Sequence, residues 1–149
     1  SGAYQRSLRQ LDPDIAVTAK ACPLFVPLVE NGRFRRGDVV IETVAREYLE
    51  PLRREGLDTL ILGCTHYPLL TDIIGDIMGP GVTLINTGEE AAWELKRTLR
   101  AMDLLAPEGP AGRATLCASD QPEHFGSLAS YFLGESLTRP VQPVDIDRY

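Results

Sequence analysis

The sequence predicts an α/β fold built on a mainly parallel sheet. Short apolar runs, typical of buried parallel strands, alternate along the chain with longer segments of helical periodicity. Residues 59–62 and 82–85 are two such runs, and a helix signal follows each of them. With 149 residues and 44% hydrophobic side chains, the chain is also long enough to bury a substantial core.

The elements before the first of these runs are predicted from turn and cap residues. Residues 4–11 have a helical pattern, and the weak alternation of residues 15–21 predicts a strand. Asp38 is a suitable cap for a following amphipathic helix, which Gly56 would stop. Pro51 inside that helix is expected to kink it or split it.

The central part of the chain continues as helix, strand and helix. Pro68 is expected to begin a helix that ends near residues 79–81. After the strand over residues 82–85, Thr87 and Glu90 fit a capping box, with Thr87 as the helix cap.

The last part begins with a Pro/Gly-rich linker over residues 107–112. A strand over residues 114–118 is expected to precede a helix that Asp120 begins. Residues 141–146 predict a final edge strand, since Pro143 cannot donate to a sheet ladder. The last two helices are expected to bury one apolar face each: Ala92, Leu95, Leu99 and Met102, then Phe125, Leu128, Ala129 and Phe132.

Composition excludes several classes of function. A net charge of −6 without a basic patch argues against nucleic acid as a partner. Apolar stretches stay well below the roughly 18 residues of a membrane-spanning helix. Three irregularly spaced cysteines favour a reducing cytoplasm over a disulfide framework. The chain opens with Ser1 and not with Met, so we expect a processed chain or a fragment.

Candidate site residues follow from the sheet. Ligands of open parallel sheets bind beyond the carboxyl ends of the strands. The residues at such ends are Cys22, the triplet of residues 64–66, Asn86 with Thr87, and Ser119 with Asp120.

The triplet Cys64-Thr65-His66 carries the most chemistry. A cysteine near a helix N-terminus, two residues before an imidazole, is favoured as a thiolate that can take a proton or attack carbon. Thr65 offers a hydroxyl and a backbone N–H, and His66 can carry protons near neutral pH. The alternative is that Cys64 is a small buried hydrophobe, as free cysteines usually are.

Cofactor chemistry is disfavoured. Cys64, His66, Cys117 and His124 could supply zinc ligands, but their spacing matches no zinc motif, and we expect no metal. Pyridoxal phosphate needs a Schiff-base lysine, and the only lysines are Lys20 and Lys96. No glycine-rich phosphate loop follows a strand.

Five stretches together resemble the family of bacterial glutamate racemases. Residues 60–70, L-I-L-G-C-T-H-Y-P-L-L, look like the family signature, and the similarity covers the whole chain. The other four flank it in the family's order: S-G-A-Y at residues 1–4, A-C-P-L-F-V-P-L-V-E at 21–30, L-I-N-T-G-E-E at 84–90 and D-Q-P-E-H-F at 120–125.

The resemblance implies a cofactor-independent enzyme that interconverts L- and D-glutamate and supplies D-glutamate for peptidoglycan. In the family, one cysteine thiolate removes the α-proton and a second cysteine returns one to the opposite face. Cys64 would be the second cysteine of that pair. Thr65 would hold the substrate's carboxylate or amine, His66 would assist Cys64, and Glu30 would orient His66.

The resemblance also implies that the chain is a C-terminal half. The family's N-terminal half carries a D-S-G-x-G-G stretch, whose Asp supports the first cysteine, and a C-N-T stretch with that cysteine. Neither stretch occurs here, and Asn86 replaces a usual Asp. Residues 1–84 would then be most of the second lobe, and residues 85–149 the segment returning to the first. Incomplete three-layer lobes leave apolar faces uncovered. We therefore expect an inactive chain whose partners are glutamate, the missing N-terminal half and, alternatively, a second copy.

Three alternatives stay open from the sequence. The chain could derive from a related aspartate or hydantoin racemase. It could be a non-catalytic half-domain kept for binding. Lastly, Cys22 could replace the absent cysteine, although two-face chemistry needs opposed groups.

Overall fold

The computed structural model describes residues 2–107, 109 and 112–148. Ser1 of the first resembling stretch, and Glu108, Pro110 and Ala111 of the predicted linker, lie outside the described residues. The chain divides into two compact units, Ser1–Gly88 and Glu89–Tyr149. The predicted lobe boundary between residues 84 and 85 stays a prediction.

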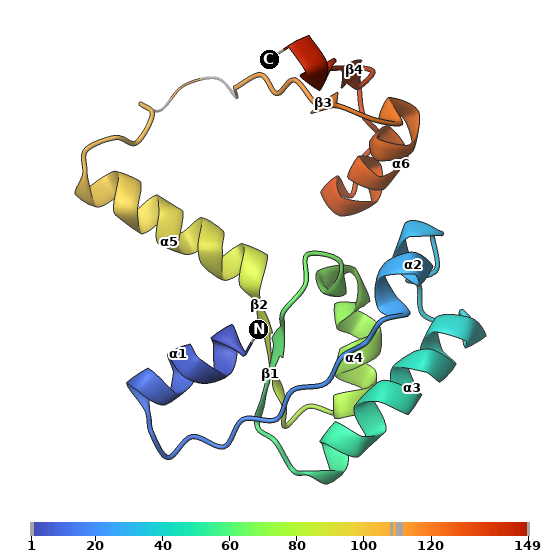
Figure 1. Cartoon of the computed structure of the whole chain (residues 1–149), viewed down its shortest axis with the longest axis vertical. Helices are drawn as coiled ribbons and strands as arrows, with labels where there is room; N and C mark the ends of the chain where they lie inside the picture. Colours follow the sequence, from blue (N-terminus) through green and yellow to red (C-terminus); the bar gives the residue numbers. More distant parts are fainter. Residues whose placement is uncertain (1, 108, 110–111, 149) are drawn as a thin grey trace. The chain divides into compact units, whose positions relative to one another are not determined.

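The first unit alternates helices with two parallel strands (Figure 1). Strands β1 and β2 pair in register, Thr59 with Thr83 through Leu62 with Asn86. The parallel α/β arrangement predicted from the sequence is thereby confirmed. The elements are α1 (Ala3–Leu11), α2 (Phe25–Glu30), α3 (Val39–Arg54), β1 (Thr59–Leu62), the 3-10 turn η1 (Tyr67–Leu70), α4 (Thr71–Met78), β2 (Thr83–Asn86) and the start of α5 (Thr87–Ala101).

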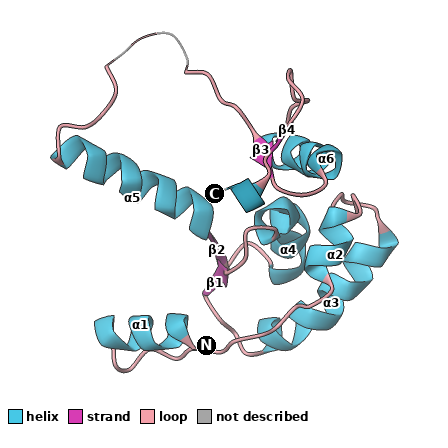
Figure 2. Cartoon of the chain, turned by 45° about the horizontal axis from the view of Figure 1, so that its top comes forward, coloured by secondary structure: helices cyan, strands magenta, loops and turns pink. Residues whose placement is uncertain are grey.

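The core of the first unit lies between the strand pair and three helices. Helices α2, α3 and α4 gather on one side of β1 and β2, with α1 on the other (Figure 2). Phe25, Ile41, Leu70 and Ile74 are among its fully buried side chains. Helix α2 packs against α3 and against η1. This packing places α2 beside the turn that follows β1.

The second unit contains the rest of α5 and four short elements. They are β3 (Cys117–Ala118), α6 (Pro122–Leu133), β4 (Gln142–Pro143) and the 3-10 turn η2 (Ile146–Arg148). The strands β3 and β4 pair in parallel over two residues each. The predicted strands over 114–118 and 141–146 were therefore too long, because a ladder extends only where a partner strand is present.

Two predictions in the first unit were wrong. Residues 15–21 form no strand, although Ile15 and Val17 are half-buried between exposed neighbours. Alternation reports one covered face, but a strand also needs a partner for its backbone. Pro51 neither kinks nor splits α3, which runs unbroken to Arg54. The proline removes the one backbone hydrogen bond that its own N–H would donate, and the helical bonds of the neighbouring residues do not depend on that N–H.

The cap of α5 and the burial of the last helices were also mispredicted. Asn86, not Thr87, caps α5: its side-chain oxygen accepts a hydrogen bond from the Gly88 N–H at 3.0 Å. Neither α5 nor α6 has a buried residue. Leu95 is 58% exposed and Phe132 is 41% exposed. Periodicity identifies the face that seeks a partner, but it cannot say whether the chain provides that partner.

No helix in the described part of the chain combines the length and the apolar character that crossing a membrane requires.

Candidate active site

The candidate site is the turn that follows β1. Strand β1 ends at Leu62, and Gly63 lies against the ring of Tyr4 from α1. Cys64 then begins a tight turn in which its carbonyl accepts a hydrogen bond from the Tyr67 N–H at 3.2 Å. The half-buried strand thus delivers three polar residues to one corner, with Cys64 half-buried and Thr65 exposed.

Thr87 fixes the strand end below this corner. Its hydroxyl donates to the Leu62 carbonyl at 3.1 Å, which joins the start of α5 to the end of β1. The rule that neighbouring parallel strands end at one edge singles out Thr87 from the sequence. The bond itself explains why Thr87 does not act as the helix cap.

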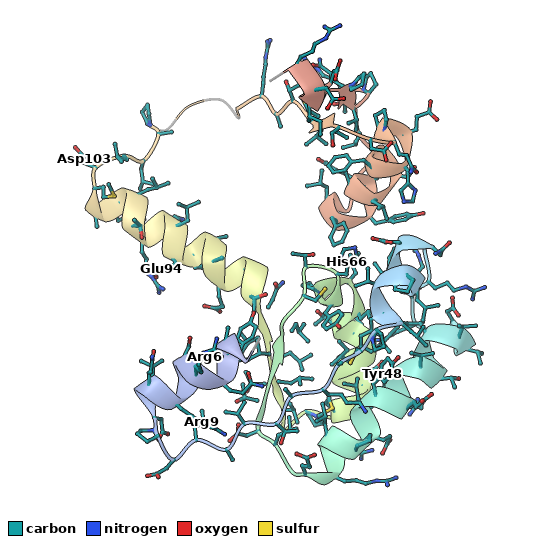
Figure 3. All side chains as sticks on the ribbon, viewed as in Figure 1. Arg6, Arg9, Tyr48, His66, Glu94 and Asp103 are labelled. Carbon is teal, nitrogen blue, oxygen red and sulfur yellow. The ribbon has the colours of Figure 1, made fainter. Side chains whose placement is uncertain are left out.

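His66 lies in the turn between β1 and α4 (Figure 3) and contacts two side chains. Its Nε2 is 3.2 Å from Oε1 of Glu30, the last residue of α2. Its Nδ1 is 3.2 Å from the Thr65 hydroxyl. A neutral ring that donates from Nε2 to the carboxylate accepts the hydroxyl hydrogen at Nδ1. The two contacts together therefore orient the imidazole.

Solvent reaches this group of side chains only in part. The His66 side chain is 20% exposed and that of Glu30 is 38% exposed. Contacts of this kind in a half-buried corner are stronger than the same contacts in bulk water. The corner can therefore hold an anionic or amino substrate group while staying open to it.

Cys22 lies in a different environment from Cys64. It precedes α2, is 7% exposed, and its thiol points to the Lys20 carbonyl at 3.8 Å. Burial raises the pKa of the Cys22 thiol above its ordinary value of 9.0, and nearby Lys20 offsets part of this effect. A buried neutral thiol is a poor proton acceptor.

The remaining candidate residues belong to the second unit, whereas the corner belongs to the first. Cys117 is exposed in β3, and His124 is exposed on α6. Over the described residues, no three His, Cys, Asp or Glu side chains gather where they could hold a metal ion.

The sequence did not indicate Tyr67 as part of the site. Its hydroxyl donates to the Cys22 carbonyl at 3.4 Å, and its ring meets Phe25 edge-on. Contacts across 45 residues leave no local pattern in a sequence.

Comparisons with known proteins give one consistent result. No family model matches the chain. The glutamate racemase of Geobacter metallireducens is 42% identical over 137 residues, which are 92% of this chain and 50% of that protein. The glutamate racemase of Mycobacterium marinum is 47% identical over 146 residues, which are 96% of this chain and 53% of that protein. The chain spans about half the length of the curated relatives it matches.

Solved structures agree with the sequence relatives. A glutamate racemase from Francisella tularensis, in complex with D-glutamate, matches 99% of this chain and 54% of its own, with TM-score 0.84 and 30% identity. A glutamate racemase from Thermus thermophilus, in complex with β-chloro-D-alanine, matches 99% and 53%, with TM-score 0.81 and 44% identity. Glutamate racemases are isomerases that act on an amino acid. In sequence and in fold alike, this chain is similar to glutamate racemases over about half of their length.

Proposed function

We propose that this chain is the C-terminal half of a glutamate racemase and supplies one of its two proton carriers, Cys64. The observation that carries the proposal is the corner after β1, where His66 contacts both Thr65 and Glu30 directly after that cysteine in the chain. The identity of 42–47% to glutamate racemases supports glutamate as the substrate over aspartate or a hydantoin.

In this proposal the Cys64 thiolate removes the α-proton of L-glutamate and becomes a thiol. The electron pair of the broken C–H bond stays on the α-carbon. A second cysteine, in the missing half, donates its proton to the opposite face and becomes the thiolate, which gives D-glutamate. The reverse reaction uses the two cysteines in exchanged roles, and no cofactor is needed.

The other corner residues assist this transfer. Thr65 holds the substrate's carboxylate or amine through its hydroxyl and its backbone N–H. His66 holds or releases a proton beside Cys64 during the transfer. Glu30 orients His66. Fixed donors of this kind stabilise the carbanion because they are already aligned when its charge develops.

The missing half is the principal partner in this proposal. Helix α5 and the turn after it expose three large apolar side chains, Trp93 by 53%, Leu95 by 58% and Met102 by 60%. Large exposed apolar patches mark surfaces that bind another protein. The missing half would cover these side chains, and in its absence we expect self-association, with a homodimer as one form. The enzyme would act in the cytoplasm, where free cysteines stay reduced, and its D-glutamate would serve peptidoglycan synthesis.

A chimaera tests the proposal. The first half of the Geobacter metallireducens enzyme is joined to this chain, and interconversion of L- and D-glutamate is followed by chiral chromatography. We expect racemisation by the chimaera, its loss in C64S, and its retention in C117S, which alters an exposed cysteine far along the sequence. Aspartate and hydantoin substrates are assayed in parallel.

The isolated chain provides the opposing test. We expect no racemisation from it, because one thiol can serve only one face of the α-carbon. Measurable racemisation by the purified 149-residue chain that disappears in C64S would contradict the two-half mechanism.

A further inference from the structure

Tyr67 joins the turn that carries His66 to the segment that carries Glu30. Its hydroxyl donates to the Cys22 carbonyl at 3.4 Å. Its ring meets the Phe25 ring edge-on, with centroids 5.3 Å apart and planes at 90°. Both partners lie directly before or at the start of α2, so one side chain spans the two parts of the corner.

Tyr67 makes these contacts within a cluster of packed aromatic side chains. Phe25 is 1% exposed and also meets Tyr48 of α3 edge-on at 5.3 Å. Burial raises the pKa of Tyr67 above its ordinary value of 10.0, and Cys22, Cys64 and Tyr48 add to this rise. The phenol therefore stays neutral and keeps the hydrogen that it donates to Cys22.

The contacts of Tyr67 constrain the positions of both Glu30 and His66. Phe25 is the first residue of α2 and Glu30 is the last, so fixing one end of this single short helix fixes the other. Tyr67 directly follows His66, so the turn cannot shift without moving both residues. The Thr65 contact to His66 cannot replace this anchor, because Thr65 lies in the same turn and moves with it.

We propose that Tyr67 is a positioning residue that holds His66 against Glu30. The inference rests on the proposed function, because only a racemase site gives the His66–Glu30 contact a catalytic purpose. Tyr48 serves as the comparison residue, since it meets the same Phe25 ring from α3 and not from the turn that carries His66.

The test uses NMR of the ring nitrogens of His66 in the 149-residue chain. The chain has two histidines, so His124 on α6 serves as an internal reference. E30Q establishes which shift reports loss of the Glu30 contact. We expect Y67L to move the His66 signals in the same direction, Y67F to move them less, and Y48L and Y48F to leave them in place. His124 should not respond to any of these changes.

Two results would overturn the inference. One is a His66 signal that stays in place in Y67L, or in Y67F if Y67L does not fold. The other is an equal displacement in Y48L, which would make the effect a general one of the aromatic cluster. Because these signals need no turnover, a negative result here leaves the chimaera's racemisation unaffected. If Y67L displaced the His66 signals while the chimaera showed no racemisation, the result would count against the proposed function alone.

Discussion

Glu30 Oε1 lies 3.2 Å from His66 Nε2, although 36 residues separate the two in the chain. The contact joins the last residue of helix α2 to the turn after strand β1. Neither residue is fully buried, so the contact depends on how α2 and the turn are held. This dependence makes it testable by substitution.

Replacing Glu30 by Gln keeps the shape of the side chain and removes its charge. In the chimaera we expect E30Q to lower kcat by up to about 100-fold, because a mispositioned proton-carrying group loses much of its contribution. KM should change little, since Glu30 is not placed on the substrate. E47Q on the exposed side of α3 is the matched control. Equal kcat values for E30Q and the unchanged chimaera would remove Glu30 from the mechanism.

Leu70→Ala should destabilise the first unit strongly. Leu70 ends the η1 turn and is 0% exposed, so truncation leaves a cavity in the core and is expected to cost about 2–5 kcal/mol. Leu95→Ala makes the same chemical change at a side chain that is 58% exposed, and its effect should stay within about 0.5 kcal/mol. Urea unfolding followed by far-UV circular dichroism compares the two. Similar midpoints would show that the core is not where the structure puts it.

Asp38 is expected to stabilise helix α3 through its cap. Its carboxylate accepts from the Val40 N–H at 3.0 Å and also meets Arg33 at 3.1 Å. D38A should lower the free energy of unfolding by about 0.5–2 kcal/mol. D38N keeps the cap and loses the ion pair with Arg33, so it should retain most of the stability. If D38N were as unstable as D38A, the ion pair and not the cap would be the stabilising contact.

Stability should fall at alkaline pH in part through Cys22. Burial raises the pKa of this thiol above its ordinary value of 9.0. As the pH passes about 9, the thiol of the unfolded chain ionises while the folded one stays neutral. Ionisation lowers the free energy of the unfolded state relative to the folded state, so the protein becomes less stable. Below that pH both states are protonated and Cys22 gives no pH dependence. C22A should flatten the decline of the unfolding midpoint between about pH 8 and pH 10; an unchanged slope would mean that the thiol is accessible to water.

Much of the architecture could be read from the sequence because its signals are local. The apolar run over residues 59–62 matches β1 closely, and Gly56, with φ of +71°, follows the end of α3 as expected. The polar triplet after β1 could be found for the same reason, since a parallel strand ends where its apolar run stops. The prediction of a strand over residues 15–21 was wrong. Alternation records burial of one face of a segment, but it does not show that a partner strand is present.

By itself, the sequence determined the order of α3, β1, α4 and β2, the polar corner after β1 and the resemblance to one half of a racemase. These rest on periodicity, cap residues and motif spacing, which act over a few residues. Only the tertiary structure decided that Glu30 meets His66, that Tyr67 reaches back to Cys22, and that Asn86 rather than Thr87 caps α5. Such contacts depend on how packed helices bring distant segments together, because side chains pair by distance in space and not by separation in the chain.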